Sequence, residues 1–250
     1  MRRNIEQNSP KSAPSGDKSL AIMQPYFLPY LGYWQLMQSV DEFIVYDDVQ
    51  FSKGGWINRN RLLLGGAAHT FTLPLRKGRL GDKINERYLS ENHEAASQSL
   101  LAKVSQAYGD APFFAKVMPV FERIMTADET NLGDFLFMSL EQVKKYVGLK
   151  TPLLRASELD AGQGLRADER VLAICKTRDA RLYVNAPGGR DLYDKDAFRE
   201  QGLDLKFIEP AEITYPQFDG DFVPSLSILD VMMFNDPAEI RDMLTRYRLD

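Results

Sequence analysis

The stretch "LAIMQPYFLPYLGYWQLMQSVDEFIVYDDV" (residues 20–49) decides the fold class. It opens with a short apolar run that Pro25 stops, which is typical of a buried strand. Apolar residues then recur at helical spacing from Leu31 to Val40, and a second apolar run ends in Asp47 and Asp48. A strand, a helix and a second strand this close together predict a βαβ unit, in which parallel strands are joined by a right-handed crossover.

The rest of the chain extends this alternation of strands and helices. Further strands are predicted at residues 69–75, 153–157, 181–185 and 204–210. Helices are predicted at residues 94–109, 113–125, 131–148, 168–177, 194–201, 225–234 and 236–247. The helix at 113–125 contains Pro119, so we expect it to be kinked or divided in two. We predict an α/β fold with a mostly parallel Rossmann-like sheet and a helical insertion at about residues 92–148.

The N-terminal residues 1–18 differ in composition from the rest of the chain. They are polar and rich in Ser, Pro, Asn and Lys, so they cannot bury enough apolar surface to offset the entropy of ordering. We therefore predict a flexible tail at residues 1–18 and a single α/β domain at residues 19–250.

Charge and composition exclude several classes of function. The net charge is -4, so general binding to DNA or to membrane surfaces is not expected, although this charge still allows a local basic pocket. No apolar run is long enough to span a membrane. The single cysteine, Cys175, lies on the apolar side of a predicted helix and is expected to be a buried structural thiol, which suits the cytoplasm. With only two histidines, neither a His-rich metal site nor a Ser-His-Asp triad is expected, and we predict no protein-bound metal site.

Unusual polar segments follow three of the predicted strands. They are "QPYFLPYLGYW", "DDVQFSKGGWINRNR" and "NAPGGRDLY", which begin at Gln24, Asp47 and Asn185. Ligands of open α/β sheets bind beyond the carboxyl ends of the strands, where such segments converge. The sequence therefore predicts a ligand site at one rim of the sheet.

The second segment supplies the candidate catalytic residues Asp47, Asp48, Lys53 and Arg59. The carboxylates can bind a metal ion or a sugar hydroxyl, or accept a proton from an amine, and the cations can neutralise phosphate. Each residue also has a plainer interpretation, since paired aspartates often end a strand in a turn and basic runs are usually solvated.

The candidate substrate-binding and nucleotide-binding residues offer aromatic faces, amide groups, hydroxyls or open backbone. Aromatic rings suit sugars and bases, although rings at helical spacing are more often part of a core, and "PSLSILD" can be core throughout. Glycine pairs let backbone N–H groups approach a phosphate. The set comprises Gln24, Tyr26, Tyr30, Tyr33, Trp56, Asn58, Asn60, Arg61, Asn185, Gly188, Gly189, Ser227 and Asp230.

Four motifs in this order resemble the WbqC-like family. They are the stretch from "IMQPYFLPY" to "YDDVQF", then "GGWINRNR", "YVNAPGGRDLY" and "FVPSLSILDVMMFN", and the resemblance runs from about Ser19 to the C-terminus. It implies a role in O-antigen or surface-polysaccharide biosynthesis, with transfer of glycine to form an amide on an amino sugar. The substrates implied are a nucleotide-linked amino sugar and glycine or a glycyl donor.

The opening unit is more distantly similar to nucleotidyl-transferring enzymes of the pantothenate synthetase type. Those enzymes carry an HxGH motif at the start of the first helix, where this chain has "YLGY" (residues 30–33), with the glycine but without the histidines. This similarity implies activation of a carboxylate as an acyl adenylate, with ATP and Mg²⁺ as cofactors. Two alternatives stay open: transfer from a charged tRNA or carrier thioester, and a non-catalytic protein that binds a sugar nucleotide.

Overall fold

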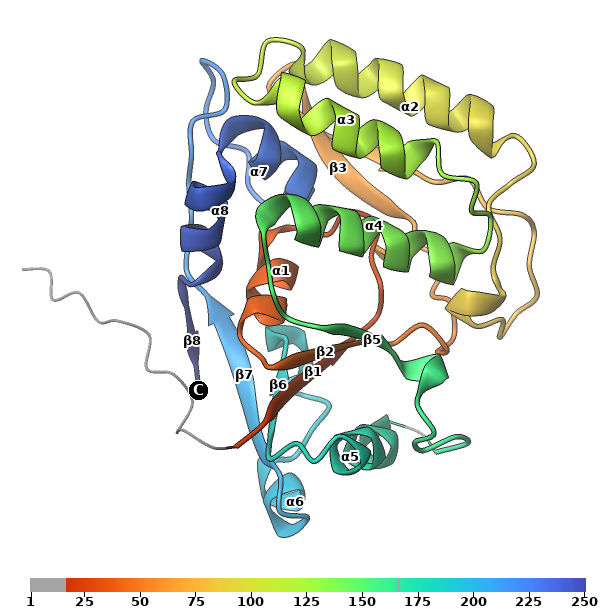
Figure 1. Cartoon of the computed structure of the whole chain (residues 1–250), viewed down its shortest axis with the longest axis vertical. Helices are drawn as coiled ribbons and strands as arrows, with labels where there is room; N and C mark the ends of the chain where they lie inside the picture. The colour runs from red at the N-terminus through yellow and green to blue at the C-terminus, as the bar shows by residue number, and fades with distance from the viewer. Residues whose placement is uncertain (1–16, 166) are drawn as a thin grey trace, which may run out of the picture.

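A computed structural model describes residues 17–165 and 167–250 of the chain. Its centre is a six-stranded sheet in the order β5-β2-β1-β6-β7-β8, in which only β8 is antiparallel to its neighbour (Figure 1). The strands are β1 (Ser19–Met23), β2 (Glu42–Val45), β5 (Leu153–Arg155), β6 (Leu182–Asn185), β7 (Asp204–Pro210) and β8 (Tyr247–Leu249). This is the strand order of doubly wound Rossmann folds, so the predicted fold class is confirmed.

Helices pack on both faces of this sheet. On one face lie α1 (Leu31–Gln38), α4 (Leu132–Val147) and α8 (Pro237–Leu244); on the other lie α5 (Ala167–Thr177) and α6 (Lys195–Glu200) (Figure 1). Successive strand residues point to opposite faces, so in β1 Ala21 joins the first core, whereas Leu20 and Ile22 join the second. Both faces of the sheet are therefore buried, as parallel strands require.

The middle of the chain forms a layer beside the sheet. It contains the helices α2 (His93–Tyr108) and α3 (Phe114–Met125), followed by α4, and the helix α7 (Ile228–Phe234) packs against it. Helix α3 continues through Pro119 as one helix. Predicted helix ends are confirmed at Asn131, whose Oδ1 accepts from Asp134 N at 3.2 Å, and at Gly148, which ends α4 with φ +84°.

Two strands of the structure, β3 and β8, differ from the sequence prediction. Residues 59–61, predicted as loop, open the strand β3 (Arg59–Leu64), which pairs with β4 (Ala67–Thr72) in a separate antiparallel hairpin. Gly65 and Gly66, both at positive φ, make its two-residue turn. The alternation of polar and apolar residues in β3 was hidden because its buried face includes the polar Asn60. The short C-terminal strand β8 was not predicted.

Three short 3₁₀ turns complete the fold: η1 (Ile84–Glu86), η2 (Ala156–Glu158) and η3 (Pro187–Gly189). Residues 1–16 of the predicted tail lie outside the described residues. In the described part, no helix combines the length and apolar character needed to cross a membrane.

Cys175 lies on α5 and is buried in the core between this helix and the sheet. Burial raises the pKa of its thiol from 9.0 to about 12. The thiolate is thus about a thousandfold scarcer at neutral pH than for a free thiol. We expect Cys175 to react at least that much more slowly with a disulfide reagent in the folded protein than in urea. Equal rates in the two states would contradict this burial.

Candidate functional site

The sheet changes direction of winding between β1 and β6. These strands are neighbours, with Leu20 opposite Tyr183, but the chain leaves β1 towards β2 and leaves β6 towards β7. The loops that follow Met23 and Asn185 therefore start from the same edge and diverge, and in this class of fold ligands bind beside such a switch point. We call this edge, at the carboxyl ends of the parallel strands, the rim.

The β6 loop keeps its backbone open at the rim. Gly188 has no atom near the position that a Cβ would take, whereas a Cβ at residue 189 would clash with Asn185 Nδ2. Asn185 is buried, and its Oδ1 accepts a hydrogen bond from Ala186 N at 2.8 Å. Asn185 and Gly189 thus fix the turn, and Gly188 is the residue of this motif that a ligand can approach.

The loop after β1 is held by side chains from two other motifs. Asn60 Nδ2 donates to the carbonyl oxygens of Phe27 at 3.0 Å and Leu28 at 2.7 Å, and Ser227 Oγ donates to the Leu28 oxygen at 2.8 Å. Leu28 is buried with φ +47°, a conformation that a leucine adopts only when its surroundings enforce it. Asn60 and Ser227 therefore shape the loop from inside the protein.

Asn60→Ala should destabilise the protein by about 2–3 kcal/mol, because two buried carbonyl groups lose their donor and Leu28 loses support. Asn58 is the matched control: it is half-buried, and its Nδ2 makes one bond, to Leu73 O at 2.8 Å. We expect Asn58→Ala to cost about 1 kcal/mol. Urea unfolding of both variants measures the difference, and equal losses of stability would argue against the support of the β1 loop by Asn60.

Trp56 carries two arginines on its ring. The guanidinium carbons of Arg59 and Arg61 lie 5.2 and 5.3 Å from the ring centre, since alternate residues of β3 point the same way. Arg59 also donates to Gly54 O, and Arg61 Nη2 donates to Ser225 O at 2.8 Å. The ring and the two cations form one group, attached to the β1 loop through the bond from Phe27 N to Ile57 O at 3.0 Å.

The predicted aromatic residues of the β1 loop differ in exposure. Tyr33 is buried, donates to Gln24 O at 3.1 Å, and lies 5.7 Å from the ring of Tyr26. Burial raises the pKa of Tyr26 and Tyr30, and raises that of Tyr33 well above its usual value, so all three hydroxyls remain protonated donors. Tyr30 is nevertheless the least buried of the three, at 41% exposure, and is the ring that a ligand can reach most readily.

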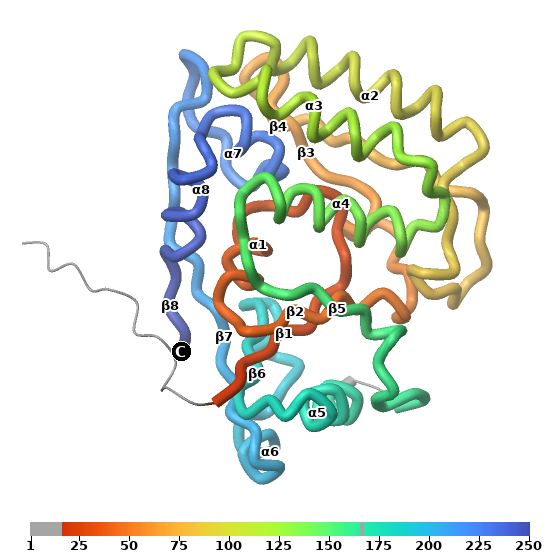
Figure 2. Tube along the Cα trace, viewed as in Figure 1, coloured from red at the N-terminus to blue at the C-terminus, as the bar shows by residue number. Residues whose placement is uncertain are grey.

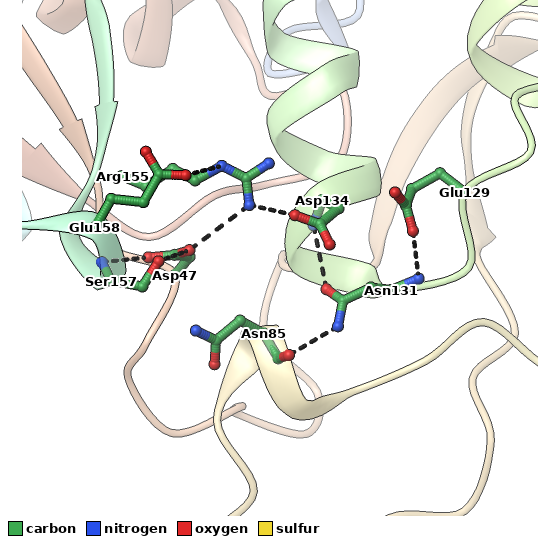
Figure 3. Close-up of polar contacts among 8 residues, drawn as sticks. All are labelled: Asp47, Asn85, Glu129, Asn131, Asp134, Arg155, Ser157 and Glu158. Carbon is green, nitrogen blue, oxygen red and sulfur yellow. Dashed lines mark hydrogen bonds and ion pairs between the residues drawn. The ribbon is translucent and has the colours of Figure 1, made fainter.

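Asp47 lies at the rim but is fully engaged by its neighbours (Figure 3). Its Oδ1 accepts from Ser157 N at 3.0 Å, its Oδ2 accepts from Ser157 Oγ at 2.7 Å, and Arg155 Nη1 lies 3.9 Å from Oδ2. Arg155 also pairs with Asp134 at the start of α4 and lies 3.6 Å from Glu158. Asp47 therefore joins the ends of β2 and β5, and Arg155 joins them to α4.

The same network continues to the 3₁₀ turn η1 (Figure 3). Asn131, the cap of α4, donates through Nδ2 to Asn85 O at 2.8 Å, and its backbone N–H donates to Glu129 at 2.8 Å. The backbone N–H of Asn85 donates to Asp47 O at 3.0 Å, so the network returns to Asp47. The sequence prediction did not include Arg155 or Asp134; the signal for Arg155 was a charged residue within the strand predicted at residues 153–157, and the structure ends that strand at Arg155.

Asp48 differs from Asp47 in what surrounds it. It pairs with Arg170 on α5, and the two residues are only 9% and 7% exposed. Asp48 Oδ1 and Arg170 Nε are buried without a hydrogen-bond partner in the described part of the chain. The Arg170 guanidinium also lies 5.0 Å from the centre of the Tyr46 ring. Asp48 is thus the rim carboxylate with an oxygen that no described residue uses, and Arg170 is a further residue that the sequence prediction missed.

Asp230 lies far inside the protein. It accepts from Tyr108 OH at 2.8 Å, Tyr215 OH at 2.6 Å and Gln217 Nε2 at 2.6 Å, and Tyr108 OH in turn accepts from Leu63 N at 2.8 Å. These bonds tie α7 to α2, β3 and the segment before α7. Asp230 therefore holds the helical layer together, and it is fully buried.

Comparison with known proteins places the chain in a family. The model of the WbqC-like protein family matches residues 24–242, which is most of the chain. The chain belongs to the WbqC-like protein family. A relative from Mycobacterium tuberculosis, "Uncharacterized protein Rv1507c", is 31% identical over 230 residues, which cover 91% of this chain and 97% of the relative. No solved structure matches the chain.

In this WbqC-like protein, the predicted residues fall into two groups. Gln24, Tyr30, Asp48 and Gly188 belong to loops that leave the rim, with the group of Trp56, Arg59 and Arg61 attached to the β1 loop. The second group holds or packs against the surrounding segments and comprises Tyr26, Tyr33, Asp47, Asn58, Asn60, Asn185, Gly189, Ser227 and Asp230. Lys53 is exposed, and no hydrogen bond between described residues joins the segment 54–61 to the β6 loop.

Two further features of this WbqC-like protein concern other kinds of site. Within residues 17–165 and 167–250, no three His, Cys, Asp or Glu side chains are grouped as metal ligands. A depression of about 450 Å³ lies at the opposite edge of the sheet, beside Asp41 and Thr151, which precede β2 and β5. None of the residues predicted to bind substrate lines it.

Proposed function

We propose that this protein is a transferase that attaches glycine through an amide bond to an amino sugar, with the sugar linked to a nucleotide, in O-antigen or other surface-polysaccharide biosynthesis. The observation that carries the proposal is that two family motifs leave the sheet at the switch point between β1 and β6, and that two more motifs are hydrogen-bonded to the β1 loop. That place in a doubly wound sheet is where nucleotides and similar phosphorylated ligands bind. Membership of the WbqC-like family supports the class of reaction, and we propose that it takes place in the cytoplasm.

The reaction needs a group that receives a proton. The sugar amine attacks the glycyl carbonyl carbon, a C–N bond forms, the donor's leaving group departs with its bonding electrons, and the new ammonium loses a proton. We assign that proton to Asp48, because its Oδ1 lacks a partner in the described chain while both oxygens of Asp47 are engaged. Arg170 holds Asp48 in place through the ion pair.

The diphosphate group of a nucleotide-linked sugar needs cations and backbone N–H donors to bind it. Arg59 and Arg61, held against Trp56, offer guanidinium N–H groups beside the β1 loop. Gly188 offers an unobstructed backbone on the β6 side of the rim. If glycine is activated by ATP, Mg²⁺ would need only one or two carboxylates besides the phosphates, and Asp48 is the candidate for that contact.

Purified protein incubated with a nucleotide-linked amino sugar tests the proposal, with mass spectrometry detecting a glycyl increment on the sugar. One arm supplies free glycine, ATP and Mg²⁺; a second supplies glycyl-tRNA; a third supplies a glycyl thioester. Product with AMP release in the first arm supports adenylation, and product in another arm identifies an activated donor. Absence of product in all arms would refute the transferase assignment for these substrates.

A sugar-nucleotide-binding protein without catalysis is the second candidate. It is favoured by the number of motif residues whose polar atoms are used within the protein, such as Asp47, Asn60 and Ser227. Calorimetric binding of the sugar nucleotide without product in any arm would support this alternative, and loss of that binding in Arg59→Ala would place it at the same rim.

A further inference from the structure

Positive charge is concentrated in one part of this acidic chain. Between Lys53 and Arg87 there are eight Lys or Arg residues and two acidic residues, a local net charge of +6 in a protein whose total is -4. A field of this kind attracts a polyanion even when the whole protein is acidic.

The fold brings the two ends of this segment together. Gln50 and Lys83 form an antiparallel bridge, Phe51 N donates to Asp82 O at 2.9 Å, and Ile84 N donates to Val49 O at 2.9 Å. Lys53 therefore stands close to the loop 76–83, which runs along the edge of the molecule away from β8 (Figure 2). We call Lys53, Lys77, Arg79, Leu80 and Lys83 the basic loop.

The four cations of the basic loop are exposed, and no ion pair joins them to any residue of the described chain. The two acidic residues nearby do not neutralise them. Asp82 lies 3.7 Å from Arg87 and accepts from Arg79 N at 2.7 Å, while Glu86 accepts from Lys83 N at 2.8 Å. The lysine and arginine heads therefore face water.

Leu80 stands at the tip of this loop with its side chain wholly in water, at 100% exposure. Gly78 and Gly81 flank it closely, and Gly81 has φ +96°, which turns the chain sharply at the tip. A fully exposed leucine between cations contributes no stability in water, but its transfer into an apolar phase lowers the free energy.

We infer that the basic loop docks this protein on an anionic membrane surface, with the cations on lipid phosphates and Leu80 inserted among the acyl chains. Each cation near such a surface strengthens binding about fivefold, and burial of one leucine strengthens it about tenfold or more. RNA fits less well, because it offers no apolar surface to Leu80, and the nearby Trp56 ring already carries Arg59 and Arg61. This docking does not depend on which reaction the rim catalyses.

Sedimentation of the full chain with vesicles tests the inference. At low salt, we expect binding to vesicles of phosphatidylcholine and phosphatidylglycerol in equal parts, and little binding to phosphatidylcholine alone. Leu80→Ser should weaken binding about tenfold, and Lys77→Gln combined with Arg79→Gln by more than tenfold. All these positions are exposed, so melting temperatures should not change.

Matched controls come from other exposed positions. Leu192 is 73% exposed in a loop between Asp191 and Tyr193, and Lys150 and Lys176 are exposed elsewhere. Leu192→Ser and the double variant Lys150→Gln, Lys176→Gln should bind vesicles like the wild type. No binding to the anionic vesicles, or equal weakening by the controls, would overturn the inference. So would a transfer-RNA pool that displaces the vesicles and is bound equally by Leu80→Ser.

Discussion

Asp230→Ala is expected to lower the free energy of unfolding by about 3 kcal/mol at neutral pH and the melting temperature by roughly 6–12 °C. Asp230 is fully buried, and the substitution leaves Tyr108 OH, Tyr215 OH and Gln217 Nε2 without their acceptor. The loss should be structural, because Asp230 is fully buried and joins α7 to α2. Urea unfolding followed by circular dichroism measures it.

The size of this loss should depend on pH. Burial raises the pKa of the Asp230 carboxyl above 3.8, although hydrogen bonds from Tyr215, Tyr108 and Gln217 oppose the shift. The folded state thus binds the proton more tightly than the unfolded state, so this contribution to stability is present below about pH 3.8 and is lost as the pH rises through the folded pKa. We expect the difference between wild type and Asp230→Ala to be larger at about pH 4 than at about pH 7.

Asp219 provides the control for this experiment. It is an exposed aspartate in the segment before α7, so Asp219→Ala should change stability by less than about 0.5 kcal/mol. If Asp230→Ala unfolded at the same urea concentration as Asp219→Ala, the buried network would contribute no stability.

Asp48→Asn is expected to reduce amide formation by about 10²–10⁴-fold, because asparagine cannot accept the proton released by the attacking amine. The substitution should also lower the free energy of unfolding by about 3 kcal/mol, since it leaves the buried guanidinium of Arg170 without its counter-charge.

A second substitution separates the two effects. Arg170→Gln in the Asp48→Asn background removes the unpaired charge, so the double variant should regain much of the lost stability without regaining activity. Recovery of product together with stability would assign Asp48 to structure. Asp47→Asn is the neighbouring control: it should lower stability through the lost bond with Ser157, while each folded molecule keeps most of its activity.

The sequence determined the local structure of this protein because local patterns depend on residues within a few positions of one another. The βαβ unit at residues 20–49, the helix that begins at Asn131 and the helix that follows Asp236 were all predicted from such patterns, and the structure contains them. The carboxyl ends of parallel strands share one edge, so a common rim for the loops that begin at Gln24 and Asn185 could also be predicted.

Only the tertiary structure decided which polar residue does what. Asp47 and Asp48 are neighbours in sequence, yet one is held by Ser157 and Arg155 and the other by Arg170, 122 positions away. Asn60 and Asp230 have side chains typical of ligand-binding residues, but both are buried and hold other segments in place. Asp230 does so through Tyr108, which is also 122 positions away. Such partners are chosen by the packing of the whole chain, and no pattern within a few residues records them.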